Sequence, residues 1–360
     1  MINNTISEIN NMISKIILEE KVQQAKNWID KSENIVIVSH VNPDGDAIGS
    51  SLAMYHFLFS ISKNVTVIVP DTIPAFLTWM SGCKDVLIYN KMKEESDQKL
   101  AEADLIMALD LNTINRVGRM ADAVDLSPAK KILVDHHPNP GGFCQLVISH
   151  PEICSTAEMV FRLICRMGHF SEINLPCAEC IYVGMMTDTG AFTYNSNNTE
   201  LYVIIAELIK KGINKDAIYN NVYNKYSADR FRLMGLALNK KMKIYPEYKA
   251  ALITLTNEEQ AEYNFRKGDC EGFVNIPLSI DGIIFSAFFR QDDEKIRISF
   301  RSQGSFPVNK ISAENFNGGG HLNAAGGESL LSMEETIQKF ESILPKYKEF
   351  LEDYKKNENK

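Results

Sequence analysis

Residues 40–50, HVNPDGDAIGS, bring His40, Asp44 and Asp46 close together in the chain. Imidazole and carboxylate groups at such short spacing are able to coordinate a divalent cation. The residues before them, NIVIVS (34–39), form an apolar run typical of a buried strand, and residues 47–60 have helical periodicity. The segment is therefore predicted to be a strand-to-helix turn. In α/β proteins such turns lie at the carboxyl edge of the sheet, where ligands bind, and the helix N-terminus that follows favours anions.

Three further apolar segments end in acidic residues, namely Asp110 after LIMAL, Asp135 in KILVDHHP and Asp188 in VGMMTDTG. Taken singly, such residues are most often turn formers or helix caps. The carboxylates of these four segments, gathered at one sheet edge, would repel one another unless cations neutralised them. An oxygen-rich set with some imidazole suits manganese, magnesium or cobalt better than zinc. Two ions sharing a carboxylate would generate a hydroxide and hydrolyse phosphoesters.

The same motifs stand in the order of the four motifs of the DHH phosphoesterases. In addition, NGGGHLNAAGG (317–327) resembles the glycine-rich signature of the C-terminal domain associated with that family. The resemblance covers residues 34–330. Within the family, the length and the motif set are most similar to the bifunctional oligoribonucleases that also dephosphorylate 3'-phosphoadenosine-5'-phosphate (pAp).

The resemblance implies six metal ligands divided between two Mn²⁺ ions, with Mg²⁺ or Co²⁺ as substitutes. The first ion is held by His40 and Asp44, the second by Asp46, His136 and Asp188, and Asp110 bridges the two.

The neighbours of these ligands have implied roles as well. Asp135 is expected to orient His136, because a carboxylate behind a ligating imidazole fixes its tautomer. His137 is expected to face the scissile phosphate and either stabilise its charge or protonate the leaving oxygen. His137 and Asp110 are therefore the predicted catalytic residues.

A second group of residues is predicted to hold the substrate. The glycines Gly318, Gly319 and Gly320 let a backbone approach an anion closely, and His321 can pair with a phosphate. Arg301 and Ser302 end a predicted strand and offer a guanidinium and a hydroxyl. The alternative is a mobile glycine loop beside a solvated strand end. Arg116 is a weaker candidate for a phosphate contact, since an exposed salt bridge explains it equally well.

The elements that must position these residues predict an α/β fold. Apolar segments at 34–39, 65–70, 103–111 and 131–134 alternate with helical stretches, which is typical of a doubly wound, mostly parallel sheet. Helices are predicted at 155–168 and 176–188, then at 201–212 and 214–242. Strands are predicted at 251–256, 283–290 and 295–302, and a final helix from 334 onward.

The predicted organisation is a catalytic DHH domain (1–200), a helical connector (201–242) and a smaller α+β substrate-binding domain (243–350), with the active site in the interdomain cleft. The amphipathic segment 1–22 is expected to be a packed surface helix.

The amino-acid composition limits the binding partners and the cellular location that can be expected. The chain has 38 basic and 46 acidic residues, a net charge of −8, which argues against binding long nucleic acid over a broad basic face. Its seven cysteines are odd in number and follow no secretory signal, so a cytoplasmic protein without disulfides is expected. The cysteine pair in CAEC (177–180) has no second Cys or His pair at the spacing of a zinc site, so a structural zinc is not expected. No apolar run is long enough to span a membrane. The resemblance also implies a homodimer.

We therefore predict a Mn²⁺-dependent phosphoesterase that degrades short oligoribonucleotides (nanoRNA) to mononucleotides and converts pAp to AMP by hydroxide attack at a two-metal site. A phosphodiesterase for cyclic dinucleotides or linear diadenylate would use the same metals. A pyrophosphatase or exopolyphosphatase should instead carry clustered Arg and Lys in its second domain. A non-catalytic nucleotide sensor would be expected to lack a metal ligand, and none of the six is missing.

Overall fold

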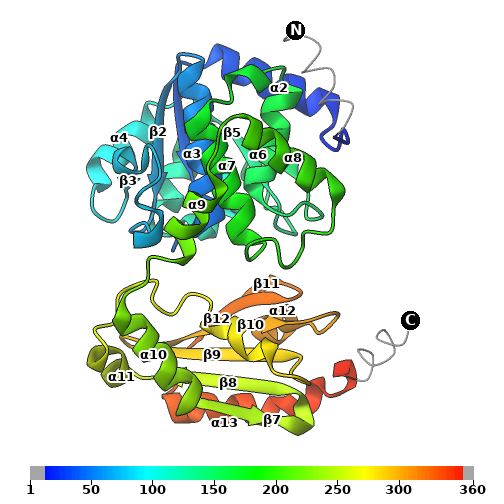
Figure 1. Cartoon of the computed structure of the whole chain (residues 1–360). Coiled ribbons are helices and arrows are strands. Elements are labelled where there is room, and N and C mark those ends of the chain that lie inside the picture. Colours follow the sequence, from blue (N-terminus) through cyan, green and yellow to red (C-terminus); the bar gives the residue numbers. More distant parts are fainter. Residues whose placement is uncertain (1–12, 352–360) are drawn as a thin grey trace. The chain divides into compact units, whose positions relative to one another are not determined.

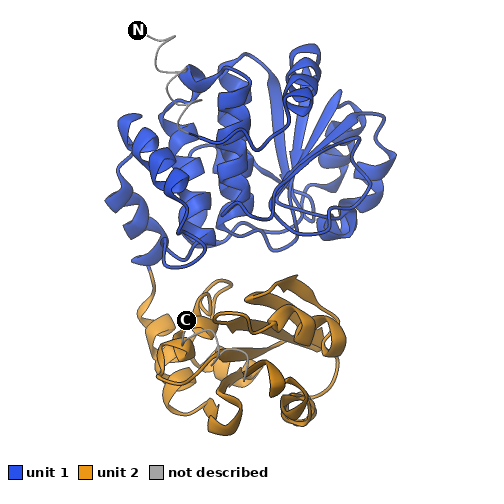
Figure 2. Cartoon of the chain, turned by 90° about the vertical axis from the view of Figure 1, so that its right-hand side faces the viewer, with its two compact units in different colours: residues 1–225 blue, residues 226–360 orange. Residues whose placement is uncertain are grey.

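The structure is a computed structural model that describes residues 13–351. The chain divides into two compact units, residues 1–225 and 226–360 (Figure 2), and each is described by itself. The helices that were predicted to form a connector are shared between the units: α8 (Thr199–Lys210) and α9 (Lys215–Tyr223) belong to the first, and α10 (Ala228–Asn239) belongs to the second.

The first unit is built on a six-stranded sheet in the order β3-β2-β1-β4-β5-β6, with every neighbouring pair parallel (Figure 1). This confirms the doubly wound parallel sheet. Its strands are β1 (Asn34–Val38), β2 (Asn64–Val69), β3 (Leu87–Ile88), β4 (Leu105–Leu109), β5 (Lys130–Asp135) and β6 (Leu146–Ser149).

Helices cover both faces of this sheet because successive strand residues point to opposite sides. Ile35 and Ile37 pack with α2, α3, α6 and α7, whereas Val36 and Val38 pack with α4, α5 and the 3₁₀ segment η3. The helices not yet bounded are α2 (Glu19–Lys31), α3 (Gly45–Ser60), α4 (Lys93–Ala101), α5 (Ala121–Leu126), α6 (Thr156–Arg166) and α7 (Leu175–Asp188), and the 3₁₀ segments are η1 (Ala75–Leu77), η2 (Cys83–Asp85), η3 (Ile114–Met120) and η4 (Phe170–Glu172).

The strand order places a topological switch point at the centre of the sheet. Chain progression runs outward from β1 toward β2 and β3 on one side, and from β4 toward β5 and β6 on the other. The segments after β1 and β4 therefore continue to opposite faces of the sheet, and in open α/β folds ligands bind at the carboxyl edge beside such a point. The first two predicted ligand segments, at His40 and Asp110, follow these two strands.

The second unit contains a mixed six-stranded sheet in the order β11-β12-β10-β9-β8-β7, in which only β8 and β9 are parallel. A phenylalanine-rich core lies between one face and α12 and α13, and α10 packs on the other face at β8 and β9. Its strands are β7 (Met242–Tyr245), β8 (Ala250–Leu255), β9 (Phe285–Asp292), β10 (Lys295–Ser302), β11 (Gly319–His321) and β12 (Ala324–Ser329), its remaining helices are α11 (Asn257–Glu262), α12 (Val308–Asn315) and α13 (Met333–Ile343), and its 3₁₀ segments are η5 (Pro246–Tyr248), η6 (Phe273–Ser279) and η7 (Leu344–Tyr347).

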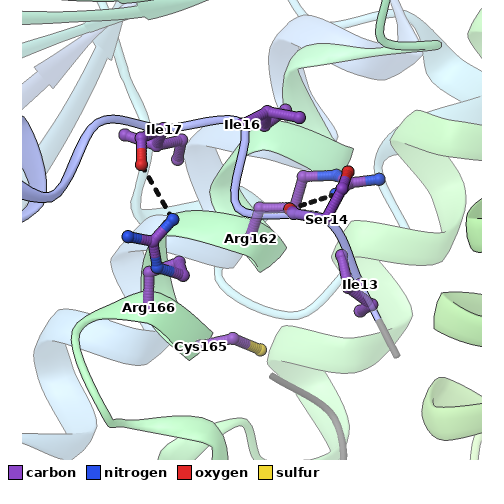
Figure 3. A pocket seen from close by; sticks show the side chains of 7 residues that line it. All are labelled: Ile13, Ser14, Ile16, Ile17, Arg162, Cys165 and Arg166. Carbon is purple, nitrogen blue, oxygen red and sulfur yellow. Dashed lines mark hydrogen bonds between the residues drawn. The ribbon is translucent and has the colours of Figure 1, made fainter. Parts of the chain in front are cut away.

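The N-terminal segment differs from the helix predicted over residues 1–22. Residues 1–12 lie outside the described part, residues 13–18 are not helical, and α2 begins only at Glu19. Figure 3 shows why: the backbone carbonyls of Ser14 and Ile17 accept hydrogen bonds from Arg162 (3.3 Å) and Arg166 (2.8 Å) of α6. Tertiary hydrogen bonds to two arginines replace the helical ones here.

Three other predictions need correction. The helix predicted over 214–242 is broken between α9 and α10, and β7 begins within its last residues. The predicted final helix ends at Ile343, before a 3₁₀ turn that contains Pro345. The alternative of a mobile glycine loop over 317–327 is also wrong, because this segment forms the β11–β12 hairpin. Within residues 13–351, no helix combines the length and the apolar character needed to cross a membrane.

Candidate metal centre

The six predicted ligands come from four chain segments that meet at the carboxyl edge of the first sheet. His40 follows β1, Asp110 follows β4, and His136 follows β5, while Asp188 ends α7. The remaining two lie at the start of α3, where Asp44 is the N-cap and Asp46 is in the first turn.

The first ligand group contains His40, Asp44 and Asp110, whose ligand atoms lie within 4.8 Å of one another. Nε2 of His40 is 3.3 Å from Oδ2 of Asp110 and 3.9 Å from Oδ2 of Asp44. Nδ1 of His40 donates to the carbonyl of Val41 (2.8 Å), so Nε2 is the nitrogen left for a metal. Nε2 is buried and has no hydrogen-bond partner within the described residues.

The second group contains Asp46, His136 and Asp188, also within 4.8 Å. Nε2 of His136 is 3.4 Å from Oδ2 of Asp188 and 3.8 Å from Oδ2 of Asp46. Nδ1 of His136 lies 3.2 Å from the carbonyl of Ile153, which again turns Nε2 toward the carboxylates.

Asp110 is placed between the two groups. Its Oδ2 faces His40, whereas its Oδ1 is 3.8 Å from Nε2 of His136 and 3.5 Å from Nδ1 of His137. Its backbone φ of 60° lies in the left-handed region, a conformation that non-glycine residues adopt mainly where the surroundings enforce it. The arrangement matches the shared ligand that a bridging role requires.

The electrostatics of the site call for positive charge. Burial, together with the charges of Asp110 and Asp188, raises the pKa of Asp46 well above its usual value. Burial also raises the pKa of Asp188 to about 6, against the opposing effect of His136. Burial by itself lowers the pKa of His40, but Asp110 and Asp44 raise it above its usual value. Divalent cations at these ligands would relieve this repulsion, so the donor set fits the predicted metals.

The structure corrects the predicted role of Asp135. Its Oδ1 accepts a hydrogen bond from Nδ1 of His137 (2.8 Å), whereas Nδ1 of His136 faces the carbonyl of Ile153. His136 and His137 are adjacent in sequence, but their rings are turned 68° from each other. Asp135, which is fully buried, therefore orients His137 in place of His136.

The start of α6 contributes contacts that the sequence analysis missed. The backbone amides of Thr156 and Ala157 donate to the two carboxylate oxygens of Asp46 at 2.6 and 2.9 Å, and the Thr156 hydroxyl donates to Oδ1 of Asp110 at 2.9 Å. The sequence does contain a pattern that indicates this helix start, the segment STAE (155–158). Ser155 caps the helix, and its hydroxyl accepts from the amide of Glu158.

Glycines allow the helices around Asp46 to approach closely. A β-carbon at Gly184 of α7 would overlap that of Ala157 and lie 2.7 Å from Oδ1 of Asp46. A β-carbon at Gly49 of α3 would lie 2.8 Å from the carbonyl of Cys180. Small residues at these positions are therefore part of the construction of the site.

A second missed residue is Asp71, just after β2. Its Oδ2 accepts from the amide of Asn42 (2.8 Å), and its Oδ1 accepts from the side-chain amide of Asn90 (2.9 Å). Asn42 has a φ of 50°, so this contact holds the strained turn between His40 and Asp44. The sequence pattern that could have identified Asp71 is VIVPD (67–71), an acidic residue just after an apolar strand.

Arg116 lies in η3, the segment that follows β4 and Asp110 in the chain. Its carbonyl accepts from the amide of Val41 (2.7 Å), and its charge acts on His40, whose pKa it tends to lower. The structure thus brings this predicted phosphate contact to the edge of the first ligand group.

In the second unit, strand register aligns two of the predicted substrate residues. Arg301 of β10 and His321 of β11 both pair with Ala324 of the intervening strand β12, so the three side chains share one face. Gly319 and Gly326 form the next row with Ser299. Arg301 and His321 thus flank a floor of small residues, separated by two strand spacings, about 10 Å.

The other predicted substrate residues divide into three kinds. Gly319 has open space around it and no positive φ, so neither packing nor backbone explains why it is a glycine. Gly318 and Gly320 are required by close contacts with β12. The prediction that Ser302 binds substrate needs correction. Its hydroxyl donates to the carbonyl of Phe306 (2.7 Å) and accepts from Asn323 (2.8 Å), so Ser302 stabilises the fold and has no proton to donate to a ligand.

Comparisons with known proteins agree with this geometry. Residues 34–185 match the DHH family N-terminal domain, and residues 249–353 match the DHHA1 domain.

The chain is similar to the bifunctional oligoribonuclease and PAP phosphatase NrnA of Thermus thermophilus, with 29% identity over 88% of this chain and 90% of that one. The protein of the same name from Bacillus subtilis is 28% identical over 84% and 91% of the two chains. The crystal structure of an exopolyphosphatase-related protein from Bacteroides fragilis is 56% identical, covers 94% of this chain and 100% of that one, and superposes with a TM-score of 0.91. This chain belongs to the DHH family of phosphoesterases, with a DHH domain followed by a DHHA1 domain.

Proposed function

We propose that this protein is a Mn²⁺-dependent phosphoesterase that hydrolyses short oligoribonucleotides to mononucleotides and pAp to AMP. The observation that carries the proposal is the sharing of Asp110 between the His40 group and the His136 group. Four carboxylates gathered in this way are costly without cations, and a bridged pair of ions suits phosphoryl hydrolysis.

The residues of the chain would divide the reaction as follows. Two divalent ions at these ligands would supply an activated water and neutralise charge that develops on phosphorus. Arg116 would bind a phosphate oxygen. His137, held by Asp135 through Nδ1, would donate a proton from Nε2 to the leaving oxygen, and the buried Asp135 carboxylate stabilises the protonated ring that this step needs.

The substrate class rests on the named relatives and on the second unit. The two NrnA proteins are named for oligoribonucleotides and pAp. Arg301 and His321 would bind a second anionic group of such a substrate, and the exposed backbone at Gly319 admits a ligand without steric conflict. A flat floor of small residues suits a planar base better than a chain of phosphates.

The test is a substrate panel. The purified protein would be incubated with Mn²⁺ and a dinucleotide, pAp, a cyclic dinucleotide or linear diadenylate, and the products separated by chromatography. We expect AMP from pAp and mononucleotides from the dinucleotide. Asp110→Asn should lower kcat/KM at least about a thousandfold, ~4 kcal/mol, and more than Asp44→Asn or Asp188→Asn, because the bridge serves both ions. Activity of Asp110→Asn within a few-fold of the parent would contradict the two-metal assignment.

The similarity to an exopolyphosphatase-related protein at 56% identity favours one other candidate, release of phosphate from inorganic polyphosphate. Such a substrate would need several cations. Arg297 of β10 and its cross-strand neighbour Arg290 of β9 lie on the same face as Arg301, but both are paired with Asp292, which offsets their positive charge. We therefore place this activity second. The same panel should include inorganic polyphosphate and pyrophosphate with phosphate release as the readout, and faster turnover of polyphosphate than of pAp would reverse the order.

A further inference from the structure

Thr156 donates hydrogen bonds to two of the six proposed ligands, one through its backbone and one through its side chain. Its amide donates to Oδ2 of Asp46 (2.6 Å), and its hydroxyl donates to Oδ1 of Asp110 (2.9 Å). Asp46 and Asp110 belong to different chain segments and to different ligand groups. Thr156 is fully buried, so solvent does not compete for either hydrogen bond.

The amide contacts follow from the position of Thr156 in α6. The first amides of a helix have no intrahelical acceptor, and here those of Thr156 and Ala157 each donate to one oxygen of Asp46. The positive end of the helix dipole also favours the ionised carboxylate. The hydrogen bond from Ala157 accordingly acts to lower the pKa of Asp46, although burial and the nearby carboxylates prevail.

The hydroxyl contact decides how Asp110 is rotated. The backbone of Asp110 is fixed in the left-handed region, but its carboxylate can still turn about the bond to Cβ. With Oδ1 held by Thr156, Oδ2 faces Nε2 of His40 and Oδ1 stays on the side of His136. The other polar atoms near Oδ1, Nδ1 of His137 (3.5 Å) and Nε2 of His136 (3.8 Å), lie farther from it than the Thr156 hydroxyl does.

We infer that Thr156 is a positioning residue that fixes the bridging carboxylate of Asp110 relative to Asp46, so that both metal sites are formed together. This inference rests on the proposed two-metal function. It concerns a residue that touches neither substrate nor metal in the proposal and acts only through two ligands.

Four substitutions isolate the hydroxyl. Thr156→Val keeps the shape and removes the hydroxyl, while Thr156→Ser keeps the hydroxyl and removes the methyl group. Thr156→Ala, compared with Thr156→Ser, removes the hydroxyl from a side chain that already lacks the methyl group. Thr336→Val is the matched control, because Thr336 is equally buried and its hydroxyl bonds only Ser329 (2.9 Å) in the second unit.

The readouts are Mn²⁺ titration by calorimetry on metal-free protein and the electron paramagnetic resonance signal of spin-coupled Mn²⁺ pairs. We expect Thr156→Val and Thr156→Ala to weaken Mn²⁺ binding at one site by about 10–100-fold and to lose the coupled signal, as for other partners of metal ligands. Thr156→Ser should stay within about threefold of the parent. Thr336→Val should leave both readouts unchanged.

The outcomes separate this inference from the proposed function. Parent-like affinity and coupling in both Thr156→Val and Thr156→Ala would overturn it, as would equal damage in Thr156→Ser. If Thr156→Val fails to fold, the Ser and Ala pair still decides. A parent protein that binds two Mn²⁺ ions but cleaves neither dinucleotide nor pAp would overturn only the proposed substrates, since the metal titrations of the variants would still test Thr156. A parent that binds no divalent ion would overturn both.

Discussion

Adjacent side chains in the DHH motif have separate partners. His136 turns Nε2 toward Asp46 and Asp188 and leaves Nδ1 to a backbone carbonyl, whereas His137 directs Nδ1 to the carboxylate of Asp135. A backbone carbonyl fixes the tautomer of a neutral ligand, and a carboxylate additionally stabilises a protonated ring. The two partners therefore suit a metal ligand and a proton donor respectively.

The residue scale yields a prediction for Asp135. Asp135→Asn retains an acceptor for Nδ1 of His137 but removes the charge that stabilises the protonated ring. We expect kcat on pAp to fall about 10–100-fold, while Mn²⁺ affinity measured by calorimetry stays close to the parent value. In a His137→Ala background the same substitution should have little further effect on kcat. A loss of Mn²⁺ affinity in Asp135→Asn would instead support the original expectation that Asp135 orients His136.

At the scale of elements, the site depends on three helices that approach one another closely at two glycines. Gly49 of α3 lies against the backbone of α7, and Gly184 of α7 lies against Ala157 of α6 and the carboxylate of Asp46. This close approach brings the N-terminus of α6 to Asp46. The glycines therefore connect helix packing directly to ligand position.

Gly184→Ala tests this connection. The added methyl group must displace α6 or Asp46, so we expect a loss of about 1–3 kcal/mol in the free energy of unfolding and weaker Mn²⁺ binding. Gly235→Ala is the control, since Gly235 is exposed in α10 with no neighbour within 4 Å of an added β-carbon. That substitution should stabilise the protein by up to about 1 kcal/mol through helix propensity. Equal effects of the two in calorimetric unfolding would refute the packing argument.

A second element-scale prediction concerns the anchoring of residues 13–17 on α6. Glu200 accepts hydrogen bonds from Arg162 (2.8 Å) and from Ser14 (3.0 and 2.9 Å). Partial burial raises the pKa of Glu200, but these hydrogen bonds lower it below its usual value. Because the folded-state pKa is the lower one, the stabilisation is present above the unfolded pKa and is lost as pH falls through the folded value.

Glu200→Gln should therefore reduce the free energy of unfolding by about 1–2 kcal/mol at pH 7, and the difference should shrink as the pH falls below the usual glutamate range. Thermal unfolding of parent and variant across pH measures this. Glu19→Gln, which removes a more exposed partner of Arg166, should change stability little at any pH. A difference for Glu200→Gln that is independent of pH would contradict the assignment.

At the scale of the whole molecule, two units with separate cores carry different chemistry. All six proposed metal ligands lie in the first unit, and Arg301, Gly319 and His321 lie in the second. The predicted interdomain cleft, homodimer and cytoplasmic location stay predictions. The net charge of −8 limits attraction of long polyanions to any part of this molecule.

Substrate length provides the test at this scale. Each phosphate beyond the local contacts should gain little and meet an acidic surface, so kcat/KM should fall as RNA lengthens from two nucleotides to about ten. The measurement is initial rates on RNAs of one base composition and increasing length. Equal efficiency on a long single strand would show that the protein has an extended binding path for nucleic acid.

The sequence alone predicted most of the strands and helices of the first unit and the candidate ligand residues, because hydrophobic periodicity is local and the candidate ligands follow or end apolar segments. The prediction of the strand at 295–302 and of the candidate ligands His40 and Asp188 needed no knowledge of packing. Only the tertiary structure decided which groups meet. The amide of Thr156 donates to Asp46, 110 positions away in the chain, and Asp135 accepts from His137 and not from the adjacent His136. The hydroxyl of Ser302 donates to the carbonyl of Phe306, and the glycine segment pairs as a hairpin. These outcomes depend on the packing of helices and strands that are distant in the chain, and spacing along a sequence does not encode which of two adjacent side chains faces a buried carboxylate.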